Sequence, residues 1–501
     1  MQRRFLANRP LKAAELLLQE RVPVEAARAR PADFAFGNAR VTSETADGAM
    51  RPFTNPDTPA PQVHLLSNGR YHVVVSVAGG GYSRWQDLAV TRWREDATRD
   101  CWGNFCYLRD MDSGDYWSVT HQPVLKPAKR YKAVFTPSRA EFRHRCGKID
   151  VHTEITVSPE DDVELRRVTV TNHSRAPRLL EFTSYAEIVL APQAADMAHP
   201  AFSNLFVQTE FVERHAAILG TRRARSREER PPWVVHLMTI RGEEHGAISC
   251  ETNRARFIGR GRTLISPDAM RTPGSLSNGT GAVLDPILSL RRSLRLATDE
   301  TARVEMITGV AATREAALAL AEKYSSAPMR DRLVDLAWTH SQVTLRHLDV
   351  TEADAQLYGR MASALVYVDA ARRASTSVLR SNRRAQSGLW SYGISGDLPI
   401  VLLRVREESK LEIVRRLIQA HTYWRMKGLP VELVIVNEDS SVYRQSLHDQ
   451  IVGLIAAGME APQLDKPGGI FVRQLDQIPT EDRVLLQAVA RLNLADDAGS
   501  L

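Results

Sequence analysis

The hydrophobic pattern changes its period twice along the chain. Between about residues 61 and 312, short apolar runs alternate with polar positions, and clusters such as Asn68-Gly69 and Gly79-Gly80-Gly81 separate the runs. A period of two indicates half-buried antiparallel strands, and the glycine-rich clusters indicate turns between them. A succession of strands this long predicts a large two-sheet β-sandwich.

From Thr313 the apolar residues recur at the helical period. The run TREAALALAEKY, with Thr313 as its N-cap, and the segments that follow predict a helical linker over residues 313–385. Beyond it, the apolar runs DLPIVLLRV, LPVELVIVN and GGIFVRQL alternate with helical stretches, the last of which is EDRVLLQAVARL. Strands that are apolar on both faces and alternate with helices predict a small parallel α/β domain over residues 386–501.

The predicted fold class is therefore multidomain β plus α/β, with a large antiparallel β-sandwich, a helical linker and a small parallel α/β domain. Residues 1–60 precede the sandwich and are expected to form an amphipathic helix followed by a linker rich in proline and alanine. The predicted boundaries are 1–60, 61–312, 313–385 and 386–501.

Composition narrows the classes of function. Among 501 residues, 43% are hydrophobic and 25% charged, with a formal net charge of +7, which is ordinary for a globular protein and argues against a nucleic-acid partner. Four cysteines without CxxC spacing or nearby histidines support neither a metal site nor a disulfide framework. No apolar run reaches the ~20 residues of a membrane span, and no signal-peptide core is visible, so we expect a cytoplasmic protein that is not embedded in a membrane. No glycine-rich fingerprint follows a strand, so we expect no cofactor.

The stretch from Pro61 to Pro123 combines four tryptophans with many charged residues. Indole faces beside charged hydrogen-bonding groups suit a sugar, because ring C–H faces pack on indoles and hydroxyls need oriented donors and acceptors. The same residues also suit core tryptophans and structural ion pairs, so both interpretations stay open. The predicted carbohydrate-binding residues are Arg92, Trp93, Arg94, Asp96, Trp117 and, further along the chain, Trp390.

Several strings resemble a known family. NGRYHVVVSVAGGGYSRW, VTRWREDATRD, WGNFCYLRD and DYWSV are similar to the opening of the glycoside phosphorylases of glycoside hydrolase family 94, formerly glycosyltransferase family 36. EFTSYAEIVLAP, GAVLDPILSLRRSLRL and GLWSYGISGDLPIVLLRV resemble the first β-sandwich region of cyclic β-1,2-glucan synthases and β-1,2-oligoglucan phosphorylases. The resemblance runs from about residue 60 to the C-terminus and implies a β-glucan oligosaccharide as partner.

The resemblance also implies an acid catalyst, an aspartate in an (α/α)6 barrel. Such a barrel needs roughly twelve helices, on the order of 350 residues with ordinary helix and loop lengths. Residues 313–501 are too few for it, and many of them follow a strand pattern. We therefore expect no counterpart of the catalytic aspartate in this chain, and we expect a separately encoded chain as a possible carrier of the barrel.

Other charged residues are candidates for chemistry. Asp397 follows Trp390 and lies in a glycine-flanked turn before a buried strand, so it is the remaining acid candidate, although the pattern favours a turn aspartate that caps local backbone amides. Arg254, Arg256, Arg260 and Arg262 alternate in RARFIGRGR, which predicts one face of an extended strand. Asn172-His173 is expected to join two strands in a hairpin.

Two hypotheses follow. The first is a carbohydrate-binding, non-catalytic portion of a cyclic β-1,2-glucan synthase or β-1,2-oligoglucan phosphorylase system. The second is an active glycoside phosphorylase or glycosyltransferase acting on β-1,2-glucan, with Asp397 or another acid. The length of residues 313–501 favours the first.

Overall fold

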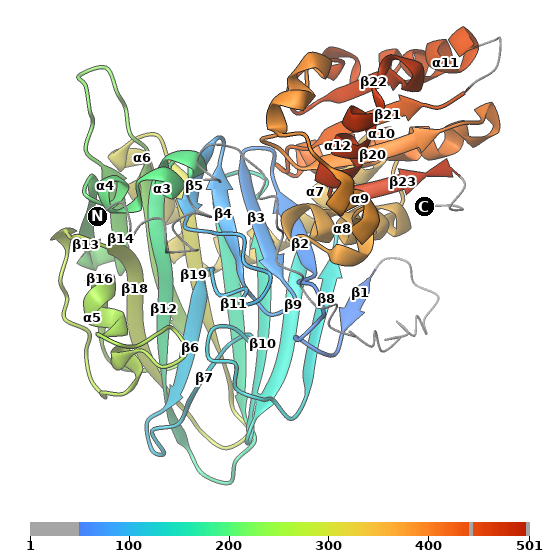
Figure 1. The fold of residues 1–501 in the computed structure, drawn as a ribbon. Helices are drawn as coiled ribbons and strands as arrows, with labels where there is room; N and C mark the ends of the chain where they lie inside the picture. The colour runs from blue at the N-terminus through green and yellow to red at the C-terminus, as the bar shows by residue number, and fades with distance from the viewer. Residues whose placement is uncertain (1–49, 440–443, 497–501) are drawn as a thin grey trace, which may run out of the picture. The chain divides into compact units, whose positions relative to one another are not determined.

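The computed structural model describes residues 50–439 and 444–496 (Figure 1). The predicted helix and linker of residues 1–60 lie outside the described residues up to position 49. The chain divides into two compact units. Of the described residues, the larger comprises 50–369 and 415–431, and the smaller comprises 370–414, 432–439 and 444–496.

Two large antiparallel sheets build the larger unit. The ten-stranded sheet consists, in spatial order, of β1 (Arg51–Phe53), β8 (Tyr131–Thr136), β9 (Arg139–Cys146), β10 (Ile149–Val157), β11 (Val163–Asn172), β19 (Thr301–Ala311), β15 (Trp233–Arg241), β14 (Ala217–Arg222), β13 (Val207–Val212) and β17 (Gly281–Ala282). The nine-stranded sheet consists of β16 (Glu243–Asn253), β18 (Pro286–Leu296), β12 (Arg178–Ala191), β5 (Leu88–Thr91), β4 (Gly81–Trp85), β3 (Tyr71–Ser76) and β2 (Val63–Ser67), with β6 (Phe105–Asp110) and β7 (Tyr116–Ser118) added beside β12.

The inward faces of the two sheets share one hydrophobic core. Phe135 and Val151 from the first sheet join Leu180, Phe182 and Leu290 from the second in a single cluster, and each of these side chains is fully or almost fully buried. Alternate residues of each strand point inward, as the period of two requires. The predicted sandwich is confirmed.

Each sheet is also covered on its outer face. Helix α6 (Arg314–Ser325) and helix α7 (Ala327–His347) pack Tyr324 and Leu333 on the ten-stranded sheet. The segment after β16, with α5 (Arg254–Ile258) and the short helix η2 (Asp268–Met270), packs Phe257 and Met270 on the nine-stranded sheet. Because both faces are covered, many strands are buried along their whole length.

Helices continue the larger unit after the sandwich. Thr313 accepts a hydrogen bond from the Ala316 amide and begins α6, as its sequence predicts. Helix α8 (Glu352–Val366) begins with a capping box at Thr351 and Asp354. Helix α10 (Leu411–Met426) begins in the smaller unit, and from Arg415 onward it belongs to the larger one.

The smaller unit is an α/β layer. Its sheet has the parallel order β22 (Ile470–Gln474), β21 (Glu432–Asn437), β20 (Ile400–Val405) and β23 (Leu492–Ala495). Its helices are α9 (Thr376–Ser381), α11 (Arg444–Ala456) and α12 (Thr480–Val489). The parallel domain was predicted, but the final predicted helix is too long: α12 ends at Val489, and Leu492–Ala495 pairs with the edge of β20.

Two further local predictions are wrong. Residues 254–258 form helix α5 because the side chain of Asn253 accepts hydrogen bonds from the amides of Ala255 and Arg256. A capped turn replaces the extended strand, so Arg254 and Arg256 do not alternate along a sheet face. Asn172-His173 does not join a hairpin either, since β11 and β12 belong to different sheets.

The turn between β3 and β4 depends on glycine. A Cβ on Gly80 would lie 2.5 Å from Oδ1 of Asp100, and one on Gly79 would lie 2.2 Å from the hydroxyl of Thr120. Only glycine permits this approach, which brings residues 97–100 and 120–122 against the turn.

None of the described helices combines the length and apolar character needed to cross a bilayer.

Candidate functional site

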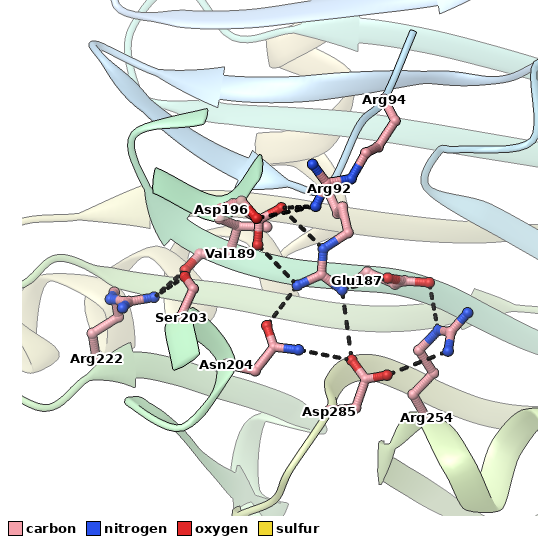
Figure 2. Close-up of polar contacts among 10 residues, drawn as sticks. All are labelled: Arg92, Arg94, Glu187, Val189, Asp196, Ser203, Asn204, Arg222, Arg254 and Asp285. Carbon is pink, nitrogen blue, oxygen red and sulfur yellow. Dashed lines mark hydrogen bonds and ion pairs between the residues drawn. The ribbon is translucent and has the colours of Figure 1, made fainter. Parts of the chain in front are cut away.

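A buried polar network of the larger unit surrounds Arg92, directly after β5. Its guanidinium contacts Oε2 of Glu187 at 2.7 Å, both carboxylate oxygens of Asp196 at 3.1 Å and Oδ1 of Asn204 at 2.5 Å. Figure 2 shows these side chains converging on Arg92 from β12, from the short helices α3 (Gln193–Ala198) and α4 (Pro200–Asn204), and from the segment before β18. Arg92 is only 6% exposed. Every polar atom of the guanidinium therefore has an acidic or amide partner.

A second arginine closes the network on its other side. Nε of Arg254 donates to Glu187 at 2.7 Å, and Nη1 contacts Asp285 at 3.3 Å. Asp285 also accepts from Asn204 at 3.1 Å and lies 3.5 Å from Arg92 (Figure 2). The three carboxylates of Glu187, Asp196 and Asp285 thus face the guanidinium groups that surround them.

Burial and charge set the protonation of this network. Burial by itself lowers the pKa of Arg92, but the hydrogen bonds and charges of Asp196 and Glu187 outweigh it and raise that pKa. The pKa of Arg254 is raised in the same way, against burial, chiefly by Glu187. Burial raises the pKa of Asp285, and the neighbouring Glu187 raises it further. The arginines stay charged at every ordinary pH and hold the surrounding loops together.

Two of the predicted sugar-binding side chains lie at the edge of this network. Nη2 of Arg94 donates to the backbone oxygen of Asp196 at 3.0 Å and to its carboxylate at 3.2 Å, and the side chain remains 26% exposed. The Trp93 indole is half-buried and packs against Tyr82, with ring centroids 5.2 Å apart. A pocket of about 10 Å³, which holds about one water molecule, adjoins them. It is lined by Tyr82, Arg84, Ala89, Thr91, Arg92, Trp93, Val189, Gln193 and Asp196.

The other predicted residues lie elsewhere. The carboxylate of Asp96 accepts hydrogen bonds from the amide and hydroxyl of Thr98, which lower its pKa, in the turn that follows Arg94. Trp117 lies in β7 and is 4% exposed, with its ring in the main core. Trp390 belongs to the smaller unit and is 63% exposed. The structure brings Arg92, Trp93 and Arg94 together, and the binding roles of all six residues stay predictions.

The smaller unit holds the remaining acid candidate. Oδ1 of Asp397 accepts from Nε2 of Gln386 at 2.9 Å, and the Asp397 amide donates to the hydroxyl of Ser395 at 3.1 Å. Both contacts are local and exposed. They are typical of a turn aspartate.

Possible metal ligands gather on the outer face of β9 and β10. Glu141, His152 and Glu154 bring their ligand atoms within 4.8 Å of one another. However, Glu141 already accepts hydrogen bonds from Arg139 at 2.7 Å and Arg143 at 3.2 Å. Two guanidinium groups beside the carboxylate oppose a cation, so the donor set fits an ion-pair cluster.

The cysteines offer no activated nucleophile in the described residues. All four are free thiols, and burial raises the pKa of Cys106 to about 12 and those of Cys146 and Cys250 to about 11. Thiols with such pKa values stay protonated and inert.

Sequence reasoning missed the acids that hold Arg92 in place. Glu187, Asp196 and Asp285 lie 95, 104 and 193 positions after Arg92 in the chain and show no shared motif. They share one signal: each is an acid within or beside an apolar strand or a short helix. An unpaired charge is costly in such a position, so each of these acids indicates a buried cationic partner.

Comparison with known proteins decides the family. The model of the glycosyl hydrolase 94 supersandwich domain matches residues 47–327. The chain belongs to glycosyl hydrolase family 94. It is 37% identical over 452 residues, 88% of its length, to the cyclic beta-(1,2)-glucan synthase NdvB of Rhizobium meliloti (strain 1021).

Further relatives of this family 94 chain are phosphorylases. The N,N'-diacetylchitobiose phosphorylase of Vibrio proteolyticus is 34% identical over 139 residues, which cover 27% of this chain and 17% of that one. The solabiose phosphorylase of Paenibacillus borealis is 26% identical over 296 residues, covering 58% and 36% respectively. The chain spans only 16% of the length of the glucan synthase. The resemblance inferred from the sequence motifs is confirmed.

Proposed function

We propose that this family 94 chain is a carbohydrate-binding, non-catalytic portion of a system that makes or degrades β-1,2-glucan. The observation that carries the proposal is its 37% identity over 452 residues to a cyclic β-1,2-glucan synthase. In this proposal the chain holds a β-glucan oligosaccharide and leaves glycosidic bond chemistry to another polypeptide region.

The geometry around Arg92 supports a glycan surface at the end of β5. The buried Arg92 fixes Asp196, and Asp196 in turn orients the partly exposed guanidinium of Arg94. Beside it, Trp93 offers an indole that is half-buried and braced by Tyr82. A sugar ring needs an oriented hydrogen-bond donor, here the Arg94 guanidinium, next to an aromatic face held in place by packing, here the Trp93 indole. The adjoining pocket is too small for a sugar, so the glycan lies across its rim.

The region after the sandwich supports the non-catalytic part of the proposal. Within residues 314–439 and 444–496, helices α6 to α8 lead into a unit built on four parallel strands. A helical barrel needs consecutive helical hairpins, and the strands break that succession. The alternative remains an active phosphorylase or glycosyltransferase that uses Asp397, whose carboxylate is exposed.

A phosphorolysis assay separates the two. The purified chain is incubated with linear β-1,2-glucan and inorganic phosphate, and glucose 1-phosphate is measured. We expect none above a boiled control. Sustained release that disappears in Asp397→Asn would establish the enzyme instead, because the protonation of a glycosidic oxygen needs such an acid.

Glucan titration by calorimetry tests the surface. Trp93→Ala is expected to weaken binding about tenfold or more, since a braced aromatic contact is worth roughly 1–3 kcal/mol. Trp338→Ala is the matched control, because Trp338 lies on α7 and is 60% exposed. Trp390→Ala, measured separately, reports whether the smaller unit adds a contact. Equal affinity in the wild type and Trp93→Ala would remove Trp93 from the surface.

The proposal extends to a partner and a location. We propose a separately encoded chain that carries the catalytic barrel, and a cytoplasmic site of action, which four free thiols support. Affinity purification from native cells tests both: a co-purifying barrel protein in the soluble fraction is expected, and its absence under mild conditions counts against an assembled complex.

A further inference from the structure

A second hollow of the larger unit lies apart from the network around Arg92. It has a volume of about 310 Å³, at the small end of the ~300–1,000 Å³ range of small-molecule sites. Its walls are the segment between β1 and β2, the β3–β4 turn, residues 97–100 and residues 121–125. The lining residues are Pro56, Asp57, Thr58, Pro59, Pro61, Gln62, Val77, Ala78, Ala97, Thr98, Arg99, Asp100, His121, Gln122 and Leu125.

Asp100 is the most constrained polar group of this cleft. Its side chain is largely buried, with one oxygen accepting from the hydroxyl of Ser76 and the other from that of Tyr367 at 2.6 Å. Gly80 leaves the room for it. Burial raises the pKa of Asp100 to about 6, and the neighbouring Asp96 contributes. With a pKa near 6, the Asp100 carboxyl accepts hydrogen bonds when ionised and can also donate one when protonated.

The rest of the polar lining carries both charges. Arg99 is exposed and, within the described part of the chain, makes no side-chain hydrogen bond or ion pair. Asp57 is 83% exposed on its side chain and lies 3.7 Å from Nε2 of His121. A cleft for an anion or a cation collects one sign of charge, whereas this one offers a cation, an acid and neutral donors at different walls.

The apolar lining completes the pattern. Pro56 and Pro59, which are partly or fully exposed, present flat, rigid C–H surfaces, and Leu125, 39% exposed, lies at the rim. A pyranose has the complementary form: C–H faces that pack on apolar surface and a girdle of hydroxyls that need donors and acceptors together.

We propose that this cleft binds one neutral sugar ring, a pyranose unit, with Asp100 and Arg99 as its main polar contacts. None of the residues that line the cleft belongs to the glycan surface proposed at Trp93. The two sites are linked through Tyr367, which accepts a hydrogen bond from Trp93 and donates one to Asp100.

Ligand-observed saturation-transfer NMR tests the proposal with glucose and methyl β-glucopyranoside as probes. Ala97→Trp places a bulky side chain at an exposed position of the cleft wall and is expected to abolish the signal. Ala319→Trp, at an exposed position of α6, is the matched control and should keep the wild-type signal. Arg99→Ala is expected to reduce the affinity about tenfold, with no effect on the melting temperature.

Three outcomes would overturn the site. They are no saturation transfer to either sugar in the wild type, an unchanged signal in Ala97→Trp, or displacement of the sugar by inorganic phosphate at equal concentration, which would indicate an anion site. The test is distinguishable from that of the glucan surface, because Ala97→Trp blocks the cleft wall without changing Trp93, and Trp93→Ala is measured with glucan.

Discussion

The indole Nε1 of Trp93 donates a hydrogen bond to the phenol oxygen of Tyr367 at 3.2 Å across 274 positions of sequence. Trp93 follows β5, and Tyr367 is the C-cap of α8, so the contact joins the sandwich to the last residues of its helical extension. The Tyr367 hydroxyl in turn donates a hydrogen bond to Oδ1 of Asp100 at 2.6 Å. One phenol therefore lies between the proposed glucan surface and the proposed sugar cleft.

Tyr367→Phe is expected to destabilise the larger unit. The change leaves the buried carboxylate of Asp100 without one of its two hydroxyl donors, which costs about 1–3 kcal/mol. Urea unfolding followed by tryptophan fluorescence measures the loss. Tyr116→Phe removes an exposed hydrogen bond of 3.4 Å and should change stability by less than about 0.5 kcal/mol. Similar losses in the two variants would contradict a structural role for the Tyr367 hydroxyl.

Arg92→Ala is expected to cost about 3–5 kcal/mol, because it leaves buried Glu187 and Asp196 without their shared cation. Arg70→Ala is the control, since the Arg70–Asp162 pair is 58% exposed on the arginine side and such pairs contribute about 0–1 kcal/mol. Urea unfolding curves measure both losses of stability, from the shift in the midpoint concentration of urea when the m-value is unchanged. A loss below 1 kcal/mol for Arg92→Ala would show that the surrounding acids find other partners.

Gly80→Ala is expected to disrupt the β3–β4 turn. The added Cβ would lie 2.5 Å from Oδ1 and 2.6 Å from the backbone oxygen of Asp100, and neither can move without breaking the contacts of residues 97–100. We expect a loss of at least about 2 kcal/mol. Gly453→Ala meets no atom within 4 Å in a helix and should stabilise slightly. A melting temperature for Gly80→Ala equal to that of the wild type would disprove the close approach.

Asp100 should give a measurable pH dependence. Its folded pKa of about 6 is raised above the usual 3.8, so its stabilising contribution is present below pH 4 and is lost as the pH rises through 6. The shift of about two units corresponds to about 3 kcal/mol. Relative to the wild type, Asp100→Asn should gain this amount between pH 4 and 7, on top of any constant offset. A pH-independent difference between the two proteins would refute the raised pKa.

His236 is expected to act in the opposite direction. It is buried between the hydroxyls of Ser184 and Thr308, at 2.8 and 2.9 Å, and burial lowers its pKa from 6.5 to about 4. Between pH 6.5 and 4 the His236 imidazole is protonated in the unfolded chain and stays neutral in the folded chain. The free energy of unfolding therefore falls by up to about 1.4 kcal/mol for each pH unit of acidification in this range. Urea titrations at pH 4.5 and 7 measure this loss of stability. His236→Gln should lose less stability than the wild type between the two pH values, whereas His245→Gln, at an exposed position, should lose as much as the wild type.

Local prediction succeeded where the pattern was long or carried a specific cap. The sandwich follows from a period of two sustained over many strands, and Thr313 begins α6 as its sequence predicts. Prediction failed where a neighbour in space decided the outcome. Leu492–Ala495 is a strand because β20 offers it an unpaired edge, and Arg254 starts a helix because the Asn253 side chain reaches two amides.

The sequence alone determined the class of fold, the order of its parts and the family, because hydrophobic periods and family motifs are both written in consecutive residues. The tertiary structure alone decided which charges meet. Arg92 finds Glu187, Asp196 and Asp285 through the pairing register of β12 with β5 and the return of the segment before β18. Such contacts depend on the stacking of whole strands, and no local pattern in the chain records them.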